Sequence, residues 1–159
     1  MYKEKLEKAK EYNDIFTLIK SVVAEKLGLH RAGLSLVLAD LPITILGLHE
    51  MGSNSIVMNR RILENIASEY DKIYRNSYIF VVLLHEYLHS FGFYDEKKVR
   101  EMVLNVVEFA FGKEHPAYFV ALNPLSLVGN RNIMLKGLNS IEPPTIVKDF
   151  DRESMPFIS

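Results

Sequence analysis

The stretch YIFVVLLHEYLHSFG, residues 78–92, predicts the central element of the fold. Its first seven residues are all apolar, which is typical of a helix that neighbouring elements bury on every side. A strand has similar composition, but this run continues without a break to Gly92 and is too long for a typical strand. We therefore predict a buried helix that starts near Ser77 and ends at Gly92, where glycine lets the chain leave through the left-handed conformation.

Two histidines on this predicted helix, His85 and His89, are four residues apart. Residues at that spacing lie on one face of a helix, one turn apart. Their imidazoles can therefore bind a single Zn²⁺ at about 2.0–2.1 Å. Glu86 is offset by about 100° around the helix, so its carboxylate can reach a water on the metal without becoming a ligand. This H-E-x-x-H pattern indicates a metal hydrolase, in which the glutamate moves a proton from the water to the leaving group.

The same letters also arise by chance on ordinary core helices, and an unligated pair of core histidines is the alternative. The apolar surroundings favour the metal site, because two imidazoles and a carboxylate are costly to bury without partners. A metal ion is the partner that would satisfy all three groups. We therefore predict a metal site on this helix.

The stretch resembles the zincin metallopeptidases, and within them the metzincin signature H-E-x-x-H-x-x-G-x-x-H. His85, Glu86, His89 and Gly92 match that signature, and Asp95 stands where it has its last histidine. The specific match covers about a dozen residues. The resemblance implies a zinc-dependent peptidase acting on peptides or proteins. His85, His89 and Asp95 would be the metal ligands, with Glu86 as general base and acid.

The third ligand has competing candidates. Asp95 is also a good N-cap for a predicted helix at 96–111. Glu108 follows His89 by nineteen residues, a spacing that resembles the gluzincin group, but the apolar stripe of its helix turns Glu108 toward solvent. His115, just before a proline, is a more distant candidate.

Three further expectations follow from the resemblance. Tyr94, beside Asp95, is the best candidate for a donor to the oxyanion of the reaction. Met134 is the best candidate for the methionine turn of the metzincins. The short strand at Ser55–Met58 takes the position of the zincin edge strand, to which an extended peptide can pair.

The rest of the chain predicts one α+β domain spanning 1–159, with a small mixed sheet of about three strands. The sheet packs on an N-terminal helix and on the buried site helix, and a further helix and an irregular C-terminal segment follow. From the spacing of apolar residues and the turn residues between them, we expect helices at 12–27, 60–70, 96–111 and 116–122, and strands at 34–39, 43–48 and 55–58.

The composition narrows the partners and the compartment. A net charge of −1 gives no electrostatic attraction to nucleic acid or to an anionic membrane. No apolar run approaches the roughly 20 residues that span a bilayer, and the N-terminus lacks the apolar stretch of a signal peptide. Cysteine is absent, which excludes disulfides and thiolate ligands. We expect a cytoplasmic protein.

Two alternatives to a peptidase stay open: a metal-dependent hydrolase of a non-peptide amide, and a non-catalytic module that binds metal or peptide. The segment 140–159 adds a separate hypothesis, because it combines prolines with acidic residues and shows little core-forming pattern. Such a tail can lie across the cleft, place a carboxylate on the metal and hold an enzyme latent.

Overall fold

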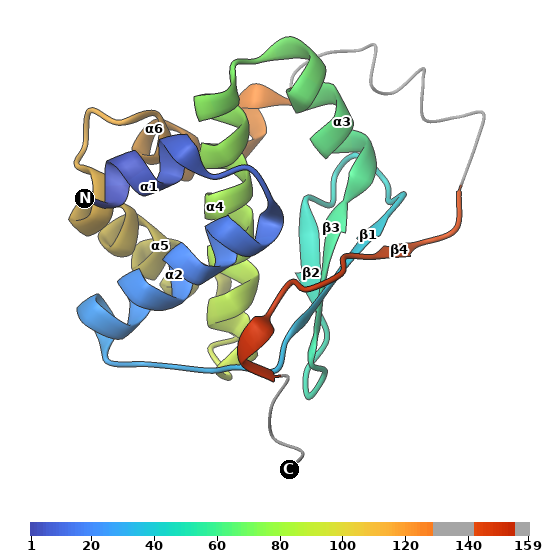
Figure 1. The fold of residues 1–159 in the computed structure, drawn as a ribbon, viewed down its shortest axis with the longest axis horizontal. Helices are drawn as coiled ribbons and strands as arrows, with labels where there is room; N and C mark the ends of the chain where they lie inside the picture. The colour runs from blue at the N-terminus through green and yellow to red at the C-terminus, as the bar shows by residue number, and fades with distance from the viewer. Residues whose placement is uncertain (129–141, 155–159) are drawn as a thin grey trace.

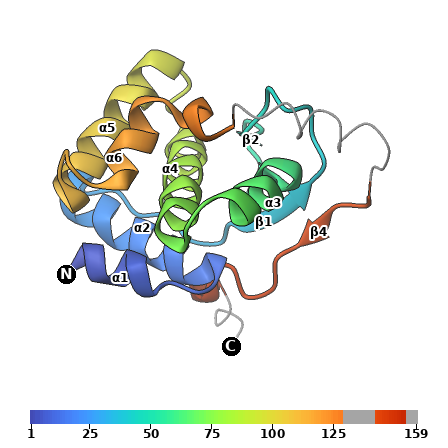
Figure 2. The same ribbon diagram turned by 90° about the horizontal axis from the view of Figure 1, so that it is seen from above.

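The computed structural model describes residues 1–128 and 142–154. Within these residues six α-helices and one four-stranded sheet form an α+β fold, which confirms the predicted class. Helix α4 runs through the middle of the molecule, with α1, α2, α5 and α6 on one side and the sheet on the other (Figure 1 and Figure 2). The described part contains no helix that combines the length and the apolar character needed to cross a membrane.

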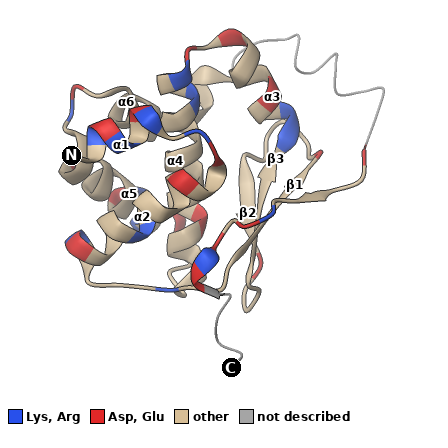
Figure 3. Cartoon of the chain, in the orientation of Figure 1, with Lys and Arg blue, Asp and Glu red and all other residues tan. Residues whose placement is uncertain are grey.

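The elements follow the chain in this order. They are α1 (Tyr2–Lys8), α2 (Tyr12–Leu27), β1 (Ser35–Ala39), β2 (Gly47–His49), β3 (Ser55–Asn59), α3 (Arg60–Glu69), α4 (Lys72–Ser90), α5 (Glu96–Phe111), α6 (Pro116–Leu122) and β4 (Thr145–Ile146), with short 3₁₀ turns at Pro124–Leu127 and Arg152–Ser154. Charged residues of both signs alternate over the outer helices (Figure 3).

The buried helix at the centre of the prediction is confirmed as α4. All residues from Asn76 to Leu84 are buried, so the helix has no solvent face over that length. It begins at Lys72, five residues earlier than predicted, and it packs against α1. There Asn76 donates hydrogen bonds to the backbone carbonyls of Leu6 and Ala9. The chain leaves α4 at Gly92, whose φ of 100° needs the conformational freedom of glycine.

The sheet has the strand order β2-β3-β1-β4. Strands β1 and β3 are parallel, whereas β2 is antiparallel to β3 and β4 is antiparallel to β1. The prediction of an edge strand at residues 55–58 is therefore wrong, because β3 lies inside the sheet and β2 forms the edge. The fourth strand, β4, comes from the C-terminal segment that the sequence predicts to be irregular.

The strand predicted at 43–48 is shortened to Gly47–His49 because a buried asparagine organises the preceding loop. The side-chain amide of Asn59 donates to the backbone carbonyls of Leu41, Pro42 and Ile45. Its Oδ1 accepts from the backbone N–H of Arg61 and so caps α3. One side chain thus fixes the loop before β2 and the start of α3.

The described part of the C-terminal segment packs against α2. Phe150 stacks on Phe16 with ring centroids 4.3 Å apart, and Asn13 donates to the carbonyl of Phe150. The buried Lys20 ammonium lies 2.8 Å from a carboxylate oxygen of Asp151, whose side chain is fully buried. Residues 142–154 therefore pack on the β1 and α2 side of the molecule.

Candidate metal centre

Two imidazoles on α4 turn their Nε2 atoms toward each other, as the four-residue spacing predicts. The Nε2 atoms of His85 and His89 are 3.1 Å apart. The Nδ1 atom of His89 lies 2.7 Å from the backbone carbonyl oxygen of Phe93. A carbonyl can only accept, so this Nδ1 carries the proton and the Nε2 of a neutral His89 presents a lone pair. Such a fixed tautomer is typical of a metal-binding histidine.

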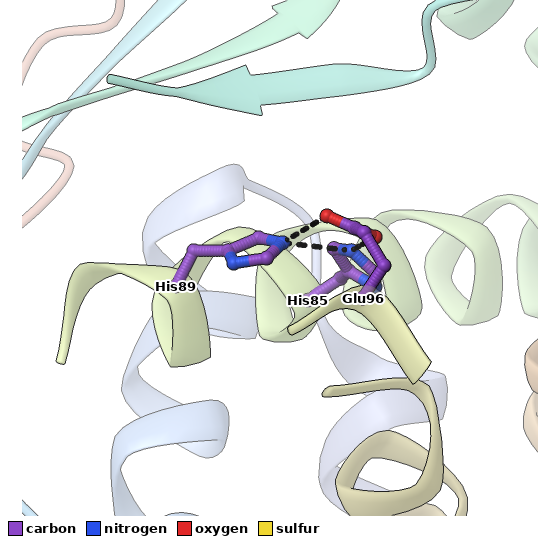
Figure 4. A group of neighbouring side chains, drawn as sticks. All are labelled: His85, His89 and Glu96. Atoms are coloured by element: carbon purple, nitrogen blue, oxygen red, sulfur yellow. Dashed lines mark hydrogen bonds and ion pairs between the residues drawn. The ribbon is translucent and has the colours of Figure 1, made fainter. Parts of the chain in front are cut away.

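A carboxylate from the next helix completes the group. Glu96 is the first residue of α5, and its Oε1 lies 2.7 Å from Nε2 of His89. Its Oε2 lies 3.0 Å from Nε2 of His85. Figure 4 shows the three side chains converging from two helices onto one small region.

The structure places Glu96, and not Asp95, next to the imidazoles. Asp95 is the N-cap of α5, and its Oδ1 accepts a hydrogen bond of 3.0 Å from the backbone N–H of Lys97. Its short side chain is turned back onto its own helix, and the carboxylate that the structure groups with the imidazoles is that of Glu96. This N-cap is the alternative role that the sequence pattern predicts for Asp95. No motif marked Glu96, whose only signal was a second carboxylate directly after Asp95.

Glu86 lies beneath the edge strand, with only 6% of its surface exposed. Burial raises the pKa of its carboxyl to about 8, and the negative charge of Glu96 acts in the same direction. A Cβ on Gly47 of β2 would stand 3.5 Å from Cγ of Glu86. The absence of a side chain at Gly47 therefore lets the strand pass directly over the carboxylate.

The same residues form part of a cleft of about 650 Å³. One wall is formed by β2 and the residues before it, and the opposite wall by α5 and the turn at 122–125. His85, Glu86 and His89 all line it, and so does Tyr94, which is half exposed. Burial lowers the pKa of His85, the charge of Glu96 opposes this, and the positive charge of Arg100 acts in the same direction as burial.

The other candidates lie elsewhere. Glu108 is exposed on α5, as its place on the helix predicts. His115 caps α6 by accepting from the backbone N–H of Ala117, and its ring stacks on Phe111 at 4.9 Å. Neither belongs to the His85, His89 and Glu96 group. Met134 lies outside the described residues.

The C-terminal segment does not supply a carboxylate to the cleft in the part that is described. No residue of 142–154 lines the cleft. Asp151 and Glu153 instead both accept hydrogen bonds from the buried Lys20. The hypothesis of a tail over the cleft is therefore wrong for residues 142–154, and residues 140, 141 and 155–159 lie outside the described part.

The donor set fits a zinc ion. Two atoms that share one tetrahedral zinc ion at about 2.0–2.1 Å lie about 3.3 Å apart. The observed separations are 3.1 Å between the nitrogens and 2.7 and 3.0 Å from nitrogen to oxygen. The three donor atoms therefore need to move apart by only about half an ångström to hold a zinc ion. Nε2 of His89 and Oε1 of Glu96 are 2.7 Å apart. A neutral Nε2 lone pair repels a carboxylate at that distance, so the contact requires a proton or a metal ion between the two atoms.

Comparison of the chain with models of protein families, with curated proteins and with solved structures gives no match.

Proposed function

We propose that this protein is a zinc-dependent peptidase of the zincin type. His85, His89 and Glu96 hold the metal, and Glu86 is the general base and acid. Peptides or proteins are the substrates, and the reaction is hydrolysis of a peptide bond. The observation that carries the proposal is the convergence of three ligand groups beside a buried carboxylate in one cleft.

The chemistry is divided between the metal and the chain. A zinc ion held by these residues would act as a Lewis acid. It would lower the pKa of a bound water to about 7 and polarise a carbonyl group of the substrate. Glu86 accepts the proton of the attacking water and then donates it to the leaving amine. Its raised pKa suits both steps, because a carboxyl that titrates near neutral pH takes up and releases a proton readily.

The edge strand offers a way to hold an extended substrate. Strand β2 pairs only with β3 among the described residues, and its residues Gly47, Leu48 and His49 line the cleft. An unpaired strand edge binds an extended peptide through backbone hydrogen bonds. We therefore assign the pairing with an extended peptide to β2, whereas the sequence pattern assigned it to residues 55–58. Tyr94 stays our candidate for the oxyanion donor, since it lines the cleft near the imidazoles.

Metal analysis and a peptidase assay test the proposal together. The purified protein should contain about one zinc per chain, and a chelator should abolish hydrolysis of an unstructured protein such as casein. Glu86→Gln should keep its zinc and lose hydrolysis. If Glu86→Gln keeps full activity, Glu86 is not the base and the mechanism is refuted. If the wild-type protein binds zinc but cleaves nothing, the site is a non-catalytic metal site.

A further inference from the structure

Arg100 is a cation that lines the cleft. It lies one helical turn after Glu96 on α5 and lines the cleft with that residue. A glutamate four residues before an arginine is the favoured orientation for an ion pair along a helix. Here both oxygens of Glu96 are directed at the two imidazoles instead. Arg100 is exposed and makes no hydrogen bond or ion pair with another described residue.

The charges around the cleft leave this guanidinium uncompensated. Arg100 is the only lysine or arginine among the described residues that line the cleft. The carboxylates Glu86 and Glu96 carry at most two negative charges, which the charge of +2 on a zinc ion would balance. One net positive charge then remains at Arg100, about 6 Å along the axis of α5 from Glu96, at a rise of 1.5 Å per residue.

The surface beside Arg100 is apolar. Leu122 and Leu125 are 59% and 53% exposed, and with Pro124 they form the wall of the cleft after α6. Val81 and Val82 of α4 lie in the same cleft. Apolar side chains that line a cleft are typical of sites that bind an apolar group of a ligand.

We propose that Arg100 binds a carboxylate of the substrate while the leucine wall holds a neighbouring apolar side chain. This inference rests on the proposed peptidase function and adds its substrate class, peptides that carry a carboxylate within a residue or two of the cleaved bond. That carboxylate has two possible sources, the free C-terminus of a short peptide or an aspartate or glutamate side chain. Arginine matches both, because its planar fork binds a carboxylate through two parallel hydrogen bonds.

Matched peptides test the inference with the zinc-loaded protein. Three N-acetylated leucine-rich hexapeptides are compared: one with a free C-terminus, one amidated, and one amidated with an internal glutamate. We expect kcat/KM for one of the charged peptides to exceed that of the neutral peptide by about tenfold, the lower end of the range for hydrogen bonds to a charged group. Preference for the first peptide identifies a terminal carboxylate, and preference for the third identifies an acidic side chain.

Variants attribute the preference to Arg100. Arg100→Gln should reduce the ratio of kcat/KM for the charged peptide to kcat/KM for the neutral peptide to about one. Lys97→Gln is the matched control, because it removes one positive charge from the same helix at a residue outside the cleft. The inference is overturned if wild type shows no preference for a carboxylate, or if Arg100→Gln retains it.

A binding measurement separates this inference from the peptidase proposal. Calorimetry compares N-acetyl-leucine with N-acetyl-leucinamide on the Glu86→Gln variant, with and without zinc and with and without Arg100→Gln. An affinity for the acid that depends on Arg100 supports the carboxylate site even if no peptide is ever cleaved. An affinity that depends on zinc alone places the carboxylate on the metal and overturns the assignment to Arg100.

Discussion

Burying Glu86 beside the metal ligands should cost the metal-free protein much of its stability above neutral pH. The folded chain holds the pKa of this carboxyl at about 8, mainly through burial, against an ordinary value of 4.5. The folded state therefore keeps a proton that the unfolded state releases as the pH rises. By linkage, the contribution is most favourable below pH 4.5 and is lost as the pH rises toward 8.

The size of the effect follows from the two pKa values. A shift from 4.5 to about 8 corresponds to a maximum of about 5 kcal/mol, at 1.36 kcal/mol for each pKa unit. Most of this change falls between pH 5 and pH 9, where the linkage relation predicts that the free energy of unfolding decreases by about 4 kcal/mol. Glu86→Gln removes the titrating group, so the variant should not show this part of the decline.

Urea unfolding of the metal-free protein in a chelator at pH 5, 7 and 9 measures the effect. The free energy of unfolding of wild type minus that of Glu86→Gln should fall by about 4 kcal/mol over this range. Subtracting the variant cancels the other titrating groups, which both proteins share. Glu101→Gln, an exposed residue on α5, serves as the control and should follow wild type. Parallel profiles for wild type and Glu86→Gln would refute the reasoning, because Glu86 would then not be desolvated.

Four further variants test the site and the fold. Glu96→Ala should lose zinc affinity, whereas Asp95→Ala should keep it and lose about 1 kcal/mol of stability as a missing N-cap, measured by zinc titration and urea unfolding. Gly47→Ala should lower the free energy of unfolding by about 1–3 kcal/mol, because its Cβ would meet neighbouring atoms at 3.0 and 3.1 Å. Lys20→Met should cost about 3–5 kcal/mol in the same unfolding experiment, since it removes one partner of the buried ion pair between Lys20 and Asp151.

The parts of the site that the sequence predicts are those that local geometry determines. The facing of His85 and His89 follows from the period of one helix, and the burial of that helix follows from its composition. The exit at Gly92 likewise depends on a few neighbouring residues. In each case the residues that define the feature are within one or two helical turns of it.

The parts that the sequence misses depend on contacts between distant segments. Nothing local distinguishes β2 from β3 as the edge strand, because the order of strands is decided by the parallel pairing of β1 with β3. Strand β4 has two residues and exists only through its pairing with β1, more than a hundred positions earlier. A strand that short carries no periodic pattern from which it can be predicted.

Asp95 and Glu96 are adjacent carboxylates, and the difference in side-chain length explains why one caps α5 and the other contacts the imidazoles. An N-cap must reach a backbone N–H two residues ahead, which suits the short arm of Asp95. The longer arm of Glu96 reaches across to α4 from the first turn of α5, where the helix dipole favours a negative charge. Asp95 therefore stabilises α5 as its cap, whereas Glu96 makes the contact with the imidazoles, so the loss of Asp95 should leave the zinc ligands in place.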